Sequence, residues 1–290
     1  MHDNLIILAG GISSRMKKPS TSNKMSKEDE NEANIKSKSL ISLGNQGRPL
    51  MDYLLYNAQK AGYKNIYIVI NEKGSLFKEF YGKKIADNNF NKLNISYATQ
   101  YIPENRIKPI GTSDAVFQAI EQFPVLKHQQ FTVCNSDNLY SEKALKKLRE
   151  TTNSNAFISY NRDTLEFSIE KILRFAIVRL DAKNYLKNII EKPPIETANN
   201  YKDNLGKIRV SMNLFKLDGN LIYSYLKNCP IHPIRKEKEL PTAILNMVKE
   251  NSNAVLGIPI SEHVPDLTSK DDIVILKEYL KKQYPDTLNW

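Results

Sequence analysis

Short, largely apolar runs alternate with amphipathic stretches along the first half of the chain. Residues 5–8, 66–70 and 131–134 are such runs, and their pattern is that of strands buried on both faces of a sheet. Between the first two runs, residues 49–63 repeat apolar side chains at helical spacing, with a proline in the first turn. A strand, a helix and a second strand in this order predict a βαβ unit, and therefore a parallel sheet with a right-handed crossover.

The second half of the chain follows a different pattern. Residues 174–181 and 185–192 are strand-like runs around a short polar turn, which indicates a hairpin rather than another βαβ unit. Further predicted elements are helices at 75–81, 218–228 and 239–250, strands at 93–98, 210–215 and 253–260, and a last helix that opens within 265–272. We therefore predict a single α/β domain over residues 1–290, divided into halves at 1–150 and 151–290.

Glycines, serines and an arginine follow the first strand, at residues 10–15. Glycine has no Cβ to separate its backbone N–H from a ligand, and N–H groups exposed at the carboxyl end of a strand form a nest for anions. The guanidinium of Arg15 adds a planar fork that suits phosphate oxygens. We interpret residues 10–15 as a cradle for a triphosphate. The competing interpretation is an ordinary surface turn after a strand.

Asp137 comes directly after the strand at 131–134. Ligands of open α/β sheets gather outside the carboxyl ends of the strands. A carboxylate at that edge, opposite an anion nest, suits a hard divalent cation that bridges protein and phosphates. The alternative is that Asp137 caps the helix expected from Ser141 onward. We favour the metal.

Composition narrows the class of protein. Of the 290 residues, 41% are hydrophobic and 26% are charged, which is ordinary for a globular chain. The net charge is +10, but the lysines are scattered and no basic–aromatic module is present, so we predict no nucleic-acid partner. A basic surface does favour small polyphosphate substrates by steering. Without a bilayer-length apolar run or a signal-peptide profile, and with only Cys134 and Cys229 as thiols, we expect a cytoplasmic protein with no membrane partner.

Residues 17–37 are almost all lysine, serine, glutamate, asparagine, aspartate and threonine. A segment with so little to bury cannot offset the entropy of ordering by packing. We therefore expect a flexible insert in the 1–150 half. It is either a lid over a bound nucleotide or a tolerated insertion.

The loop after the first strand resembles the signature of the nucleotidyltransferases that make nucleoside-diphosphate sugars, Leu-Ala-Gly-Gly-x-Gly-Ser/Thr-Arg-Leu/Met. Ser13 stands where many members have a third glycine, and molybdopterin nucleotidyltransferases, which share the fold, often have serine there. Residues 48–62 also look like a sparsely characterised bacterial subgroup of these enzymes. The resemblance implies nucleotide binding by Leu8, Ala9, Gly10, Gly11, Ser13 and Arg15.

Two further segments extend the resemblance on the nucleotide side. Residues 38–43 are similar to the family's Lys-Pro-Leu-Ile/Leu-Pro-Ile/Val, which makes Lys38 the lysine that reaches the triphosphate, with Lys36 as its rival. Residues 109–116 resemble Gly-Thr-Ala-Asp-Ala-Leu, which follows a glutamine in the family, and the glutamine and the glycine backbone read the base edge there. The residues implied are Gln100, Pro109, Gly111 and Thr112. Thr112 would also serve as the N-cap of the next helix.

The acceptor and metal sites follow from looser matches. Asn135 and Asp137 fall in a segment similar to Gly/Asn-x-Asp-Asn/His, whose aspartate holds magnesium. Asp266 fits the family's second metal ligand, although the tryptophan and glycine of that motif are missing. The implied sugar-phosphate ligands are Asn135, Glu191, Lys192 and Asn213, of which Lys192 would bind the 1-phosphate and Glu191 would accept from sugar hydroxyls.

The resemblance as a whole implies a Rossmann-like three-layer α/β/α fold with a mostly parallel central sheet and a small β-rich sugar-binding sub-structure. It implies an Mg²⁺-dependent enzyme that converts a nucleoside triphosphate and a sugar 1-phosphate into a nucleoside-diphosphate sugar and pyrophosphate. The implied catalytic residues are Arg15, Lys38, Asp137 and Lys192. Alternatives are transfer to another phosphorylated acceptor, such as phosphocholine or a molybdopterin, and a non-catalytic nucleotide-sugar-binding module. Assembly into a homo-oligomer stays open.

Overall fold

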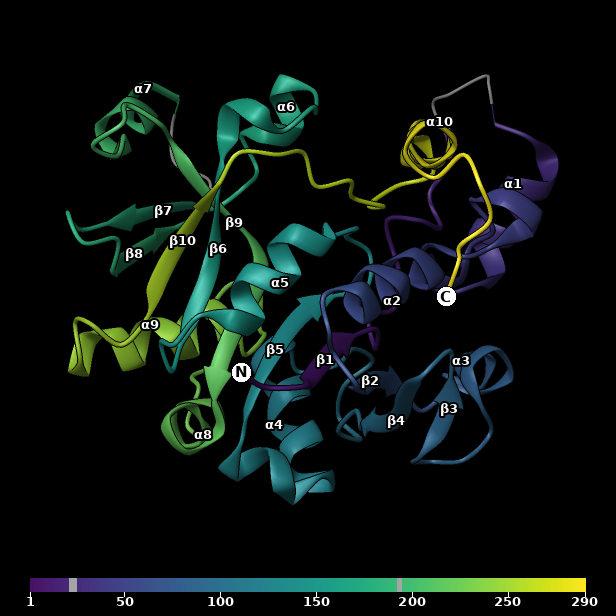
Figure 1. The fold of residues 1–290 in the computed structure, drawn as a ribbon, viewed down its shortest axis with the longest axis horizontal. Coiled ribbons are helices and arrows are strands. Elements are labelled where there is room, and N and C mark those ends of the chain that lie inside the picture. Colours follow the sequence, from purple (N-terminus) through teal and green to yellow (C-terminus); the bar gives the residue numbers. More distant parts are fainter. Residues whose placement is uncertain (21–24, 192–194) are drawn as a thin grey trace.

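The computed structural model describes residues 1–20, 25–191 and 195–290. Within these ranges ten strands form one sheet, with the order β10-β6-β9-β5-β1-β2-β4-β3 and a β7–β8 hairpin attached to β9 (Figure 1). The strands are β1 (Asn4–Leu8), β2 (Asn65–Asn71), β3 (Asn88–Phe90), β4 (Leu93–Gln100), β5 (Gln130–Asn135), β6 (Ala156–Asn161), β7 (Ile177–Leu180), β8 (Leu186–Ile190), β9 (Arg209–Asp218) and β10 (Leu256–Ile260).

Parallel pairing brings the carboxyl ends of several central strands to the same edge of this sheet. β1 lies between β2 and β5 and is parallel to both, and β2 is parallel to β4. The carboxyl ends of these four strands therefore meet at one edge. β9 runs antiparallel between β5 and β6, while β6 and β10 are again parallel. The predicted α/β fold and its largely parallel sheet are confirmed, and so is the hairpin of the second half, as β7 and β8.

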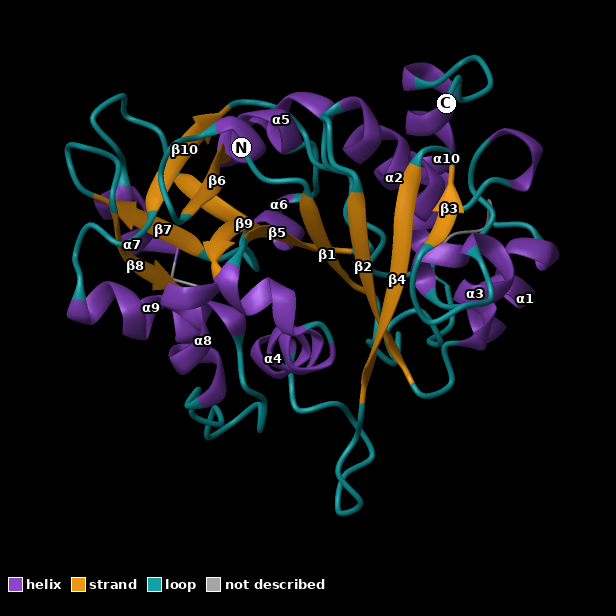
Figure 2. Ribbon diagram, turned by 60° about the horizontal axis from the view of Figure 1, so that its bottom comes forward, coloured by secondary structure: helices purple, strands orange, loops and turns teal. Residues whose placement is uncertain are grey.

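Helices cover both faces of the sheet and complete three layers (Figure 2). One face carries α4 (Thr112–Gln122), α8 (Gly219–Lys227) and α9 (Leu240–Glu250), and the other carries α2 (Leu50–Lys60), α5 (Glu142–Glu150), α10 (Asp271–Gln283) and α1 (Lys27–Ile35). The shorter helices are α3 (Ser75–Tyr81), α6 (Ile169–Ile172) and α7 (Ile195–Ala198). Two hydrophobic cores result, one on each face. β1 separates them, because Leu5 and Ile7 face one core and Ile6 the other, all fully buried.

The insert at 17–37 is better packed than its composition predicts. Ser26 caps α1, since its hydroxyl accepts a hydrogen bond from the Asp29 N–H. Ala33 is fully buried, and Lys277 of α10 forms an ion pair with Asp29 at 2.6 Å. α1 differs from the expectation of a flexible segment with little to bury, because one small apolar residue and complementary charges dock it beside α10 (Figure 1). Residues 21–24 of the insert lie outside the described residues.

The composition led us to expect no membrane partner and two thiols in a reducing compartment. Among the helices in the described ranges, none combines the length and the apolar character needed to cross a bilayer. Cys134 and Cys229 are both buried and are not bonded to each other.

Candidate active site

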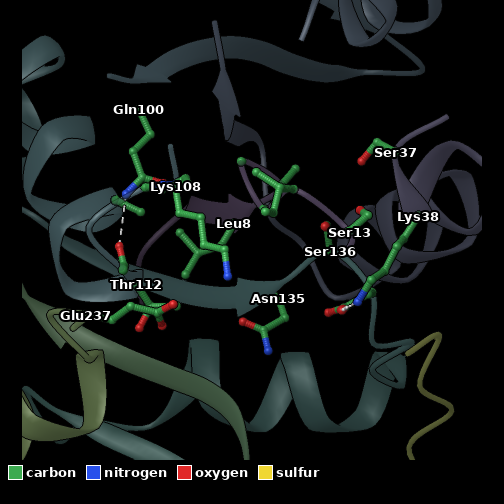
Figure 3. A pocket seen from close by; sticks show the side chains of 18 residues that line it. Leu8, Ser13, Ser37, Lys38, Gln100, Lys108, Thr112, Asn135, Ser136 and Glu237 are labelled. Carbon is green, nitrogen blue, oxygen red and sulfur yellow. Dashed lines mark hydrogen bonds and ion pairs between the residues drawn. The ribbon is translucent and has the colours of Figure 1, made fainter. Parts of the chain in front are cut away.

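A first cavity of about 270 Å³ opens at the carboxyl ends of β1, β4 and β5 (Figure 3). Its lining comes from the loops that follow these strands and from the segment before α4. Every predicted nucleotide-binding residue except Arg15 lines it, namely Leu8, Ala9, Gly10, Gly11, Ser13, Gln100, Pro109, Gly111 and Thr112. The topology therefore brings together residues that are more than a hundred positions apart in the chain.

The glycine loop is formed where β1 leaves the sheet. The last ladder hydrogen bond is donated by the Ala9 N–H to the Val69 carbonyl at 2.8 Å, and the chain then turns. Ser13 lies at φ 53°, in the left-handed region that favours glycine. This explains why glycine suits the position in the resembled signature, and it means that Ser13 holds the loop at some cost in backbone strain.

Gln100 ends β4 and lies at one end of the first cavity (Figure 3). Its side-chain amide donates to the Gly111 carbonyl at 3.0 Å and to Asp114 Oδ2 at 2.9 Å. Gly111 has φ +133°, and a Cβ there would collide with the Lys238 carbonyl oxygen, so the position requires glycine.

Thr112 has a different local role from the one predicted. The N-cap of α4 is Gly111, without a side-chain hydrogen bond, and Thr112 is the first helical residue. Its hydroxyl instead accepts from the Leu240 N–H at 2.9 Å, at the start of α9. The prediction that Thr112 caps its own helix is therefore wrong, because the first residue of α9 lies close enough to offer this hydroxyl another N–H.

Lys38 and Asp137 meet at the other end of the first cavity, with Nζ 2.9 Å from Oδ2. Figure 3 shows Lys38 on the opposite side of the cavity from Gln100. Lys38 opens a 3₁₀ turn at Lys38–Leu40, and Asp137 follows β5. The cap alternative for Asp137 is excluded, because Ser141 caps α5 through its own hydroxyl. The rival Lys36 is paired with Glu32 and does not line the cavity.

Asp266 is held beside Asp137 by the backbone. Asn138 and Asp266 form an antiparallel bridge, and the Leu267 N–H donates to the Asp137 carbonyl at 2.8 Å. Burial, together with the negative charge of the neighbouring Asp137, raises the pKa of Asp266. Lys171 Nζ lies 3.0 Å from Asp266 Oδ2 and partly offsets that charge. The fold thus pairs the two carboxylates that the resemblance assigns to metal.

The donor set at this edge suits Mg²⁺. In the described part of the chain, no three or more histidine, cysteine, aspartate or glutamate side chains lie together so that they could hold a metal ion. Two carboxylates are what Mg²⁺ commonly takes from a protein when substrate phosphates supply further oxygens. Asp137 and Asp266, beside an anion-binding loop, therefore fit this ion.

A second cavity of about 1020 Å³ adjoins the first and shares Asn135 and Asp137 with it. The predicted residues Arg15, Asn213 and Asp266 line it. Asn213 sits in β9 at φ 56°, a left-handed position that asparagine tolerates better than most residues. The remaining lining comes largely from the segment around α6, from α10 and from the chain between β10 and α10, and includes Phe167, Lys171, Arg174, His263, Tyr279 and Lys282.

The fold does not bring every predicted acceptor residue to a cavity. Glu191 is exposed, lies in neither lining and forms an ion pair with Arg235 at 3.2 Å. Lys192 falls outside the described residues. The assignment of these two residues to a sugar phosphate stays a prediction.

Some lining residues were not identified from the sequence. Ser37 and Lys108 directly precede residues that the motif matches singled out, so adjacency was a usable signal. Glu237 in the first cavity and Lys171 in the second come from segments with no matched motif. Tertiary packing brings these two residues to the cavities, and no local sequence pattern indicated this.

Comparisons with known proteins agree with this geometry. The profile of the nucleotidyl transferase family matches residues 5–256. A bifunctional sugar-1-phosphate nucleotidylyltransferase/acetyltransferase of Sulfurisphaera tokodaii is 27% identical over 210 residues, which cover 72% of this chain and 42% of that protein. The chain thus spans less than half of that relative. The crystal structure of UDP-glucose pyrophosphorylase complexed with UDP-glucose has the same fold, with a TM-score of 0.69 at 14% identity over 98% of this chain and 100% of that one.

Proposed function

Because the chain belongs to the nucleotidyl transferase family, we propose that it transfers a nucleotidyl group from a nucleoside triphosphate to a sugar 1-phosphate. The products are a nucleoside-diphosphate sugar and pyrophosphate. The acceptor class is suggested by the Sulfurisphaera tokodaii relative, which is a sugar-1-phosphate nucleotidylyltransferase with a second, acetyltransferase activity.

The observation that carries the proposal is the junction of the two cavities. Both are lined by Asn135 and Asp137, at the carboxyl end of β5. A triphosphate whose base lies near Gln100 in the first cavity would bring its phosphates toward Lys38 and Asp137. An acceptor in the second cavity would then approach the α-phosphate from the other side. This supports transfer between two bound substrates, since a simple nucleotide-binding site needs only the first cavity.

No side-chain nucleophile is required, because the phosphate of the acceptor is itself an anion. It attacks the α-phosphorus in line, a phosphorus–oxygen bond forms, and the bond to the leaving pyrophosphate breaks. The remaining tasks for the protein are positioning and neutralisation of charge. Arg15 and Lys38 would bind the leaving pyrophosphate, as their side chains reach the cavities on the side of the glycine loop.

Asp137 and Asp266 would hold Mg²⁺, which when bound neutralises charge on the transferred phosphate. Before any ion enters, the two carboxylates are balanced by Lys38 and Lys171. Lys38 would be free to contact phosphate once Asp137 served as a metal ligand. We also propose a cytoplasmic location. It is supported by Cys134 and Cys229, which are both free thiols, as is common for proteins of reducing compartments.

The test is a screen for pyrophosphate release. ATP, GTP, CTP, UTP and dTTP are each combined with a panel of sugar 1-phosphates and Mg²⁺, with phosphocholine as an alternative acceptor. The proposal expects release that requires both a triphosphate and a sugar 1-phosphate. Pyrophosphate release with a triphosphate and phosphocholine, but with none of the sugar 1-phosphates, would overturn the proposed acceptor class. Tight triphosphate binding without release under any condition would favour a binding module.

A further inference from the structure

The buried amide of Gln100 is fixed in one orientation, and this bears on which nucleobase enters the first cavity. Gln100 is 3% exposed, and its Nε2 has two acceptors, the Gly111 carbonyl oxygen and Asp114 Oδ2. Neither of these oxygens is a donor. Flipping the amide would set its oxygen against two other oxygens, so the nitrogen faces α4 and the oxygen faces the opposite way.

Asp114 is itself held in place. It is 7% exposed, near the start of α4, and the same Oδ2 accepts a second hydrogen bond from Gln118 Nε2 at 2.8 Å. Gln118 also bonds the backbone of Tyr101, just after β4, through both of its amide atoms. The orientation of Gln100 is thus determined by a network of α4 side chains and not by a single contact.

The Gln100 oxygen is left for a ligand. A Cβ built on Gly10 would lie 3.2 Å from this Oε1, so the oxygen sits against the glycine loop that lines the first cavity. Within the described residues, Oε1 accepts no hydrogen bond and is not fully enclosed. It is a hydrogen-bond acceptor at the wall of the pocket.

Several groups in the lining of this cavity are free to donate a hydrogen bond, and Gly10 lies against the Gln100 oxygen. In the described residues, the backbone N–H groups of Gly10, Gly11 and Gly111 have no partner. Lys108 has no ion pair there either, and its ammonium points into the cavity (Figure 3). The pocket therefore presents one fixed acceptor together with free donors in the same lining.

We propose that this pocket selects an imide base, that is, uracil or thymine. An imide offers an N–H between two carbonyl oxygens, which complements an acceptor between donors. Cytosine and adenine offer a ring nitrogen that accepts at the equivalent place, and the locked amide has no N–H left for it. Guanine offers an N–H with a carbonyl on one side and an amino group on the other, so a donor of the pocket would face a donor. This inference rests on the proposed function for the identity of the pocket.

The experiment measures binding and not turnover. The protein is titrated calorimetrically with UTP, dTTP, CTP, ATP and GTP in Mg²⁺, with no acceptor present. UTP or dTTP should bind about tenfold or more tightly than CTP, ATP and GTP. The ratio of UTP to dTTP affinity identifies which imide base, with its sugar, is preferred. Equal or tighter binding of CTP, ATP or GTP would overturn the proposal.

Variants test whether the fixed orientation of the Gln100 amide, which we call the lock, determines the base preference. Asp114→Ala leaves Gln100 with a single acceptor, so its amide can turn, and the preference for UTP or dTTP over CTP should fall to within about threefold. Glu121→Ala, on the same helix but exposed and bonded only to Tyr223 in the described structure, should keep the wild-type preference. Gln100→Met, which keeps the length but removes the acceptor, should lose the preference as well. Unchanged ratios in both Asp114→Ala and Gln100→Met would contradict the lock.

The two proposals fail in different ways. Selective binding of an imide nucleotide without turnover would overturn nucleotidyl transfer and leave the base assignment intact. Turnover with several bases at similar efficiency would overturn the base assignment and leave nucleotidyl transfer intact.

Discussion

Each of the two carboxylates at the junction of the cavities has a lysine of its own. Lys38 lies 2.9 Å from Asp137, and Lys171 lies 3.0 Å from Asp266. Two neighbouring carboxylates repel each other, and each lysine offsets part of this repulsion.

Asp137→Asn removes the charge of one carboxylate at nearly constant shape. We expect the variant to bind triphosphate but to lose turnover, with the barrier raised by about 3 kcal/mol or more. Steady-state kinetics at saturating Mg²⁺ together with calorimetric triphosphate binding check this. Asp87→Asn, in the loop before β3, serves as control, since Asp87 lies in neither cavity lining. Near-normal turnover in Asp137→Asn would contradict the assignment.

His2 makes the stability of the fold depend on pH. Burial, with a smaller contribution from the charge of Lys216, lowers the pKa of His2 from 6.5 to about 3. Between these values the unfolded chain binds a proton that the folded chain does not, so stability falls as pH falls through this window. From pH 6.5 to pH 5 this one group should cost about 2 kcal/mol of unfolding free energy.

The matched variant for this prediction is His2→Gln, because glutamine keeps a polar partner for Thr132, whose hydroxyl lies 3.0 Å from His2 Nε2. Urea denaturation at pH 6.5 and pH 5 should show a smaller loss of stability in His2→Gln than in the wild type. Equal losses would mean that His2 becomes charged in the folded protein.

At the scale of elements, α1 supports the segment that carries Lys38. Glu32 accepts hydrogen bonds from the Ser42 N–H at 2.7 Å and from the Ser42 hydroxyl at 3.0 Å, and it forms an ion pair with Lys36. These contacts tie α1 to the chain just after the 3₁₀ turn of Lys38. The helix thus supports the chain segment that places Lys38 at the first cavity.

Glu32→Ala should leave Ser42 without these partners and loosen the Lys38 segment. We expect a loss of about 1–2 kcal/mol in unfolding free energy and a raised KM for triphosphate, with a smaller change in the KM for the acceptor. Glu28→Ala, at an exposed position in the first turn of the same helix, is the control. If both variants show the same KM for triphosphate as the wild type, α1 does not position Lys38.

At the scale of the whole molecule, the sequence predicted what is local and missed what the fold brings together. The apolar runs located β1, β2 and β5, since a doubly buried strand needs little else to identify it. α1 escaped prediction because a single buried alanine and partner charges on α10 stabilise it. The pairing of Asp266 with Asp137 depends on a bridge between distant segments.

The same limit applies to hydrogen-bond partners. Thr112 was predicted to cap its own helix. Its hydroxyl instead accepts a hydrogen bond from the Leu240 N–H, because α9, which is distant in the chain, begins beside it. The motif-matched residues of the first cavity lie together in the fold, since several of them follow strands whose ends share an edge. The lining supplied by α6 and α10 depends on how those helices pack, and local periodicity carries no information about that.

In the proposed reaction, the acceptor phosphate attacks the α-phosphate of the triphosphate where the two cavities meet. The direct test uses a sugar 1-phosphate whose phosphate oxygens are labelled with oxygen-18, incubated with a triphosphate and Mg²⁺ and analysed by mass spectrometry. We expect all of the label to appear in the nucleoside-diphosphate sugar and pyrophosphate to be unlabelled. Label in pyrophosphate, or release of nucleoside monophosphate with the labelled acceptor left unchanged, would contradict the proposed reaction.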